Sequence, residues 1–203
     1  NNDTINRKLI GDVQVFNSAV ELVAETTNVE FEFIGSQSNE IKIEQENKKA
    51  RIIIKSNSLV DKEIIEKLYE ASEKGVKIDL IIRGACALKS GVKKISENIK
   101  VHSIVGRYLE HSRIYYFENE KNEKVFISSA DMMERNLDRR VELMVPIEKD
   151  SLKKEIIEIL FLYLKDNVKR KIQNSQGKYV KAPKTKDIIN SQEEMIKIVK
   201  GRK

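Results

Sequence analysis

The feature that most constrains the fold is a strand–helix–strand pattern between residues 50 and 84. The stretch "ARIIIKS" carries the uninterrupted apolar run Ile52 to Ile54, which is typical of a strand buried on both faces. Asp61 is a suitable N-cap for a following helix that ends near Gly75. The stretch "VKIDLIIRG" then predicts a second strand. Because a strand, a helix and a further strand form a right-handed crossover, this unit predicts parallel strands and an α/β sandwich.

Four later stretches predict more strands, at Ile99 to Ile104, Arg113 to Phe117, Val125 to Ser128 and Val141 to Val145. A long helix is expected from about Ser151 to Lys171, because apolar residues recur there at helical spacing. The C-terminal segment is basic and mostly polar, and it predicts only a short helix around Ser191 to Val199.

The first 48 residues differ from the rest. A helix is predicted from Val13 to Thr26, followed by the alternating stretches "VEFEFIG" and "NEIKIEQ", whose apolar face is thin. We therefore expect three zones: an N-terminal segment over residues 1–48, a main domain over 49–175, and a basic tail with a short helix over 176–203.

Composition narrows the class of protein. The chain has 203 residues, 40% of them hydrophobic, which is enough for one sizeable core. Cys86 is the only cysteine, so an internal disulfide is excluded, and we expect a small buried apolar residue. No apolar run approaches the ~20 residues of a membrane span and no signal peptide is evident, so we expect a cytoplasmic protein.

The net charge of +6 indicates a polyanionic partner such as nucleic acid, a nucleotide or another phosphate polymer. Lysine and glutamate are interspersed almost everywhere, however, so a solvated lysine surface explains the charge about equally well.

The stretch "LEHSRIYYF", residues 109–117, places an imidazole, a hydroxyl and a guanidinium side by side in an otherwise apolar run. Alternate side chains of a strand share a face, so His111 and Arg113 should point the same way. Histidine exchanges protons near neutral pH, and arginine offers a rigid fork that matches phosphate oxygens. The pair suits phosphoryl chemistry; a structural histidine beside a surface ion pair is the alternative interpretation.

Arg83 is a second candidate phosphate ligand. It follows the predicted strand of residues 78–82 and precedes Gly84, and open α/β sheets bind ligands at the carboxyl ends of their strands. A capping or surface role is the alternative.

Three arginines and one histidine leave alternatives open. Arg135, Arg139 and Arg140 could line a groove for a polyanion, or "LDRRVEL" could be a strand whose arginines pair with nearby carboxylates. His102, in "KVHSIV", is expected to be exposed or structural, because its distance from His111 in the sequence gives a metal pair little support.

Two signatures carry a resemblance to known families. The spacing His111-x-Arg113-x4-Glu118 is a variant of the HxKx4D signature of phospholipase-D-like enzymes, and "ISSAD" follows where that superfamily has a Gly-Ser-x-x-Asn stretch. More specific is a set of segments in the order and spacing of the last catalytic domain of the histidine-phosphorylating polyphosphate kinases: "KSNSLVD", "GVKIDLIIRG", "ENIKVHSIVGRYLEHSRIYYF" and "VFISSADMMERNLDRRVELMVPI". The chain resembles that family over roughly residues 50–175.

The resemblance implies a fold and an activity. The fold would be a phospholipase-D-like α/β sandwich, with a mixed, largely parallel sheet flanked by helices. The whole enzyme would reversibly transfer the terminal phosphate of ATP to inorganic polyphosphate, with Mg2+, through a phosphohistidine. His111 would assist as acid or base, and Arg83 would contact the nucleotide phosphates. Further motif positions, expected to bind substrate, are Arg113, Ser128, Ser129 and Arg135.

The match covers half of such a site. Phosphohistidine chemistry needs a nucleophile and an acid on opposite sides of the phosphorus, and the chain has one histidine motif. The opening "NNDTINRK" resembles the segment after the family's phosphorylated histidine, but that histidine and the magnesium-contacting arginines of the first domain are absent. We expect a C-terminal domain or a reduced relative, weakly active or inactive alone, which a first catalytic domain or a partner chain in a homo-oligomer would complete.

Two other functions fit the same residues. The chain could be a non-catalytic module that binds nucleic acid or another polyanion, with His111 as a relic. It could also be a dimeric phospholipase-D-like phosphodiesterase or nuclease that brings two copies of His111 together. The three functions make different predictions. A polyphosphate kinase domain should bind nucleotide through Arg83 and His111, and a binding module should show steep salt dependence with little effect of His111→Ala. A nuclease should cleave phosphodiesters without metal, and His111→Ala should abolish this activity.

Overall fold

The structure is a computed structural model that describes residues 50–119 and 122–201. Its helices are α2 (Lys62–Glu73), α3 (Glu134–Arg139), α4 (Asp150–Lys165) and α5 (Ser191–Lys200). Its strands are β1 (Ala50–Ser56), β2 (Lys77–Ile82), β3 (Ile99–Ile104), β4 (Arg113–Asn119), β5 (Asn122–Ser128), β6 (Met144–Pro146), β7 (Arg170–Gln173) and β8 (Tyr179–Lys181). The elements expected before residue 49 lie outside the described residues.

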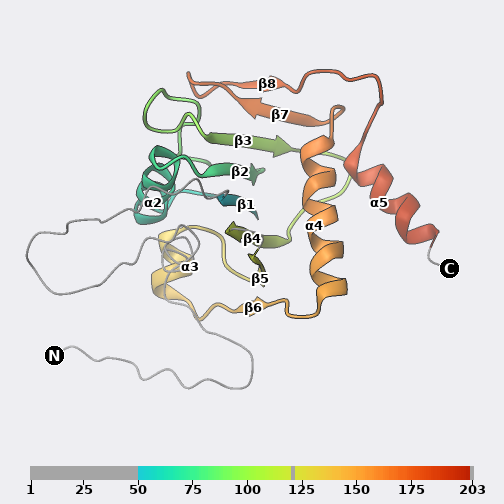
Figure 1. Cartoon of the computed structure of the whole chain (residues 1–203), viewed down its shortest axis with the longest axis horizontal. Coiled ribbons are helices and arrows are strands. Elements are labelled where there is room, and N and C mark those ends of the chain that lie inside the picture. Colours follow the sequence, from blue (N-terminus) through green and yellow to red (C-terminus); the bar gives the residue numbers. More distant parts are fainter. Residues whose placement is uncertain (1–49, 120–121, 202–203) are drawn as a thin grey trace, which may run out of the picture.

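The strands form one sheet in the order β6-β5-β4-β1-β2-β3-β7-β8 (Figure 1). β1 pairs parallel with β2 and β2 with β3, which confirms the strand–helix–strand unit. The other five of the seven strand pairs among the described residues are antiparallel, so the sheet is mixed but not largely parallel. The connection from β4 to β5 is too short for the crossover that a parallel pair requires.

Helices cover both faces of the sheet (Figure 1). Ile52 and Ile54 point to the face covered by α2 and α3, whereas Ile53 points to the face covered by α4, where it packs in a cluster with Leu160. This alternation explains why β1 is apolar at every central position. No helix in the described part of the chain is long and apolar enough to cross a membrane.

The α2 helix begins and ends where the sequence predicts. The carboxylate of Asp61 accepts a hydrogen bond from the backbone N of Ile64 at 3.0 Å, which caps the first turn. After Lys74 the chain turns at Gly75, whose φ of 87° is readily adopted only by glycine.

The long helix ends earlier than expected. It stops at Lys165, not Lys171, because the carboxylate of Asp166 accepts hydrogen bonds from the backbone N of Val168, Lys169 and Arg170 and turns the chain. Residues 170–173 then form β7 against β3, and β8 completes a hairpin. The predicted terminal helix is confirmed as α5. The expected domain boundary at residue 175 remains a prediction, and it falls inside this hairpin.

Two further predictions need correction. The strand predicted at 141–145 is shifted to β6 (Met144–Pro146). Of the two alternatives left open for "LDRRVEL", the strand is excluded, because residues 134–139 form α3: Leu137 packs against the core, and its backbone N donates to the carbonyl of Met133 in a helical turn. Cys86 is half-buried, not fully buried, and its thiol donates to the carbonyl of Leu88 at 3.7 Å.

His102 is buried and structural. Its Nε2 lies 2.9 Å from Oδ1 of Asp79, and its Nδ1 lies 3.1 Å from Nη1 of Arg170. A guanidinium can only donate, so Nδ1 accepts and the neutral ring carries its hydrogen on Nε2, toward Asp79. Burial lowers the pKa of His102, although Asp79 opposes this shift.

Stability should therefore decline in mild acid. Because the pKa of His102 is lower in the folded state, the unfolded chain binds a proton first as pH falls below about 6.5, and stability decreases until the folded pKa is reached. We expect this in urea unfolding between about pH 7.5 and 5.5. The His102→Gln variant should be less stable at pH 7.5, and its free energy of unfolding should change less between about pH 7.5 and 5.5. If the free energies of the two proteins changed in parallel with pH, the lowered pKa of His102 would not be the cause of the decline.

Candidate active site

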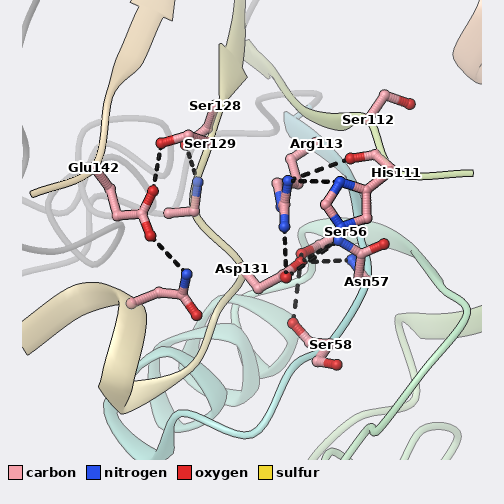
Figure 2. Close-up of polar contacts among 12 residues, drawn as sticks. Ser56, Asn57, Ser58, His111, Ser112, Arg113, Ser128, Ser129, Asp131 and Glu142 are labelled. Atoms are coloured by element: carbon pink, nitrogen blue, oxygen red, sulfur yellow. Dashed lines mark hydrogen bonds and ion pairs between the residues drawn. The ribbon is translucent and has the colours of Figure 1, made fainter. Parts of the chain in front are cut away.

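Polar side chains gather at one edge of the sheet, where β1 and β2 end. β4 is antiparallel to β1 and β5 is antiparallel to β4, so the start of β4 and the end of β5 lie beside the carboxyl end of β1. Arg113 pairs with Ser128 at this edge. Segments far apart in the sequence therefore meet here: residues 55–58, 111–113 and 128–131 (Figure 2).

Asp131 is the centre of the site. Its Oδ1 accepts hydrogen bonds from Oγ of Ser56 at 2.8 Å and from the backbone N and Nδ2 of Asn57 at 2.8 and 2.9 Å. Its Oδ2 accepts from Nη2 of Arg113 at 2.8 Å. Burial alone would raise the pKa of this carboxyl, but the donors outweigh it and hold the pKa well below its usual range. Asp131 is thus a permanent negative charge that orders its neighbours.

Arg83 joins the site through Asn57. Its Nε donates to Oδ1 of Asn57 at 2.7 Å, while the amide nitrogen of Asn57 faces Asp131. Gly84 permits this approach: its N donates to the carbonyl of Asn57 at 2.7 Å, and a Cβ there would lie 2.8 Å from that oxygen. Among the described residues, the two terminal nitrogens of Arg83 have no acceptor. They are available to bind an anion.

His111 is exposed and oriented by Arg113 (Figure 2). Its Nδ1 lies 3.3 Å from Nη1 of Arg113, which also donates to the carbonyl of His111 at 3.3 Å. Because arginine only donates, Nδ1 accepts, and the neutral imidazole carries its hydrogen on Nε2. The hydrogen bond to Asp131 raises the pKa of Arg113, so the guanidinium stays charged. The predicted pairing of His111 with Arg113 is confirmed.

The residues Arg83, Asn57, Asp131, Arg113 and His111 thus form a row of contacts along this end of the sheet. Lys55 lies beside this row and is only 3% exposed. Its Nζ donates to Oγ and O of Ser112 at 2.9 and 3.2 Å and lies 3.5 Å from a carboxylate oxygen of Glu110. Burial lowers the pKa of Lys55, and Glu110 partly offsets the shift. A small pocket opens here between the strand ends and α4, lined by Lys55, Ser56, Ile81, Arg83, Ile104, Glu110 and Tyr163.

The hydroxyls of Ser128 and Ser129 bond to the segment before β6. Ser128 Oγ donates to the carbonyl of Leu143 at 2.9 Å and accepts from the N of Ala130 at 3.0 Å. Ser129 Oγ donates to Glu142 and accepts from the N of Leu143 at 3.0 Å. These contacts connect β5 to β6, and substrate binding by either serine remains a prediction.

The two remaining motif positions are Arg135 and Glu118. Arg135 is exposed on α3, and its expected contact with substrate remains a prediction. Glu118 lies near the opposite end of β4 from Arg113, where it accepts a hydrogen bond from Tyr116 at 3.2 Å. The last position of the HxKx4D-like spacing therefore does not join the site.

Sequence reasoning missed the residues that connect the site. Asn57, Asp131 and Lys55 are not among the site residues predicted above, although Lys55 and Asn57 lie in the quoted stretch "KSNSLVD" and Asp131 lies in "ISSAD". The available signal was position: polar residues that follow a buried strand lie at the ligand-binding edge of an α/β sheet.

The described residues do not fit a magnesium ion held by the protein. Within residues 50–119 and 122–201, no group of three or more His, Cys, Asp or Glu side chains could hold a metal. Asp131 accepts from Ser56, Asn57 and Arg113, and Glu142 accepts from Asn136 at 2.7 Å and from Ser129. The carboxylates at this edge are thus engaged by protein donors.

Comparison with known proteins decides the family. The sequence profile described as "Polyphosphate kinase C-terminal domain 2" matches residues 22–192. The chain belongs to this family. It is 52% identical over 149 residues to a polyphosphate kinase of Helicobacter pylori and 53% identical over 132 residues to one of Staphylococcus saprophyticus. The two matches cover 73% and 65% of this chain but only 21% and 18% of the relatives, so the chain spans about a fifth of the length of each relative.

Solved structures agree with the family and the fold. The polyphosphate kinase of Porphyromonas gingivalis is similar with a TM-score of 0.73 at 41% identity, over 76% of this chain and 24% of that one. Nuc of Salmonella typhimurium, a phospholipase D family member, has a TM-score of 0.51 at 16% identity over 84% of this chain and 98% of that one. The second likeness shows the fold alone. The predicted phospholipase-D-like fold of the polyphosphate kinase domain is confirmed.

Proposed function

We propose that this polyphosphate kinase domain supplies one half of a site that reversibly transfers the terminal phosphate of ATP to inorganic polyphosphate. Arg83 binds phosphate oxygens and His111 exchanges the proton. The observation that carries this proposal is the row Arg83–Asn57–Asp131–Arg113–His111, in which a buried carboxylate orients two guanidinium groups and an exposed imidazole along one edge of the sheet.

Proton exchange would occur at Nε2 of His111. In the neutral ring, Nδ1 accepts from Arg113, and the hydrogen on Nε2 points away from that contact and can bond to a phosphate oxygen. To act as an acid, His111 would first take up a proton from solvent at Nδ1, in place of the contact with Arg113, and the imidazolium would then give its Nε2 proton to the oxygen of the phosphate that leaves. In the reverse direction Nε2, then without a hydrogen, takes the proton back. Arg113 holds the ring in this orientation, and Asp131 holds Arg113.

The nucleophile must come from another part of the assembled enzyme. The sequence contains two histidines. His102 is buried with both ring nitrogens bonded to Asp79 and Arg170, so it cannot reach a phosphate at the site. A phosphohistidine would therefore be supplied by a further domain or a partner chain. The family implies Mg2+, which when bound would neutralise phosphate charge; the described residues contain no cluster of ligands for it.

Replacing Arg83 with methionine should weaken binding of ATP and of tripolyphosphate to the 203-residue chain by roughly 10- to 150-fold, because a hydrogen bond to a charged group contributes about 1.5–3 kcal/mol. Titration calorimetry measures the affinity. The control Lys62→Met removes one positive charge from an exposed position on α2. Equal losses for both variants would indicate non-specific attraction of a polyanion and would contradict a specific role for Arg83.

The proposed activity can be tested in a chimera in which residues 50–201 replace the corresponding part of the Helicobacter pylori enzyme. With terminally labelled ATP and Mg2+, we expect acid-insoluble polymer from the chimera and neither polymer nor protein label from the chain alone. A folded chimera without transfer would contradict the proposal. Cleavage of bis-p-nitrophenyl phosphate by the chain alone, lost in His111→Ala, would favour a phosphodiesterase instead.

A further inference from the structure

The loop that carries His111 has little support of its own. Residues 105–112 connect β3 to β4 without regular secondary structure. The side chains of Val105 and Leu109 are 70% and 76% exposed, and Tyr108 is 47% exposed. Because these apolar residues are not packed into the core, packing alone does not determine where His111 lies.

Gln192, from the start of α5, binds this loop by three hydrogen bonds. Its Oε1 accepts from the N of Tyr108 at 3.0 Å, and its Nε2 donates to the carbonyl of Tyr108 and to Oε1 of Glu110, both at 2.9 Å. Gln192 is only 4% exposed. Both amide hydrogens and the amide oxygen are therefore used, so the side chain pairs with the loop backbone much as a neighbouring strand would.

The loop is shaped to receive this side chain. A Cβ on Gly106 would lie 2.4 Å from Oε1 of Gln192 and 2.8 Å from its Cδ, which is closer than real atoms approach. Only glycine at position 106 leaves room for the amide in its observed place. The contact thus requires a particular residue on each side: Gly106 in the loop and Gln192 on α5.

Side chains from two other elements hold the residues on either side of His111. Glu110 Oε2 accepts from the hydroxyl of Tyr163, on α4, at 2.6 Å. Lys55, at the end of β1, bonds to Ser112 and pairs with Glu110. Glu110 and Ser112 flank His111 in the sequence, and both are held by hydrogen bonds to other elements. Gln192 also bonds to Glu110, so it acts on one of the two neighbours of His111.

The start of α5 is itself anchored. Ser191 donates from its N and its Oγ to Oδ2 of Asp166, both at 2.8 Å, and Asp166 is fully buried at the end of α4. The side chain of Asn190 accepts from the N of Gln192 at 3.2 Å and caps the helix. Figure 1 shows α5 beside α4. The position of Gln192 therefore follows from the docking of α5.

We propose that α5 is a positioning element of the phosphotransfer site: Gln192 holds the loop of residues 105–112 so that His111 meets Arg113 and the phosphate. The basic C-terminal segment is on this view a part of the catalytic apparatus. Its consequence for catalysis rests on the proposed function, whereas the positioning of His111 can be observed without it.

The first test is imidazole NMR of the 203-residue chain, which contains only His102 and His111. In Gln192→Leu, we expect the His111 signals to shift and broaden while those of His102 stay close to wild type. Because three hydrogen bonds are lost, the melting temperature should fall by several degrees, but the chain should remain folded. In the chimera, the same change should lower kcat about tenfold with little change in KM for ATP. The matched control is Lys197→Gln, an exposed substitution on the same helix, which should change neither.

The second variant approaches the contact from the loop. Gly106→Ala should disturb His111 as Gln192→Leu does, and Gly106→Ala combined with Gln192→Ala should be no worse than Gln192→Ala alone, since the clash is then removed. Unchanged His111 signals in a folded Gln192→Leu chain would overturn the positioning role, as would full additivity of the two changes. Altered signals in a chain whose wild-type chimera makes no polymer would uphold positioning and reject the proposed function.

Discussion

Replacing Asp131 with asparagine is expected to lower the free energy of unfolding by about 3 kcal/mol, because removal of one partner of a buried ion pair leaves the other charge uncompensated. Asp131 accepts from donors on both oxygens, and its side chain and that of Arg113 are 11% and 12% exposed. Asparagine has one oxygen, so whichever way its amide turns, its NH2 group faces a donor. Denaturant unfolding of the 203-residue chain measures the loss.

The control for this prediction is Glu142→Gln. Glu142 also accepts two side-chain hydrogen bonds, from Ser129 and Asn136, but it lies nearer the surface, and no arginine in the described part of the chain forms an ion pair with it. We expect its loss to be about 1 kcal/mol or less. If the two variants were equally stable, Asp131 would not be the buried charge that organises the site.

Replacing His111 with alanine should lower the rate of phosphate transfer by the chimera about 100-fold or more, in the range that one general acid–base group contributes. The unfolding free energy should change by no more than about 0.5 kcal/mol, because His111 is exposed. Initial rates of polymer formation, measured beside unfolding curves, separate the chemical effect from a structural one.

The matched control is the other histidine. His102→Gln should lower stability but leave transfer by the folded protein near the wild-type rate, because His102 is buried and bonded to Asp79 and Arg170. Retained transfer in His111→Ala would remove His111 from the mechanism. A loss confined to KM in that variant would make it a binding residue and contradict its role in proton exchange.

The local elements were predictable where a short stretch of sequence contains the whole cause. The apolar run of β1, the cap at Asp61 and the turn at Gly75 are local, and the structure confirms all three. The end of the long helix was not predictable in this way. Lys171 continues an amphipathic pattern, but it lies in β7 because β3 offers an unpaired edge and Asp166 turns the chain toward it.

The candidate site shows the same division. By itself, the sequence determined the family, the strand–helix–strand unit and the closeness of His111 to Arg113, because motif spacing is a property of neighbouring residues. The contact itself does not come from strand alternation, since His111 lies in the loop before β4 and Arg113 bonds to its Nδ1 and its carbonyl. Only the tertiary structure decided that Asp131 joins Asn57, Arg83 and Arg113, and that Gln192 reaches the loop of His111. These contacts span 18 to 84 residues of sequence, and their partners are chosen by the order and direction of strands and by the docking of α5, which no local pattern encodes.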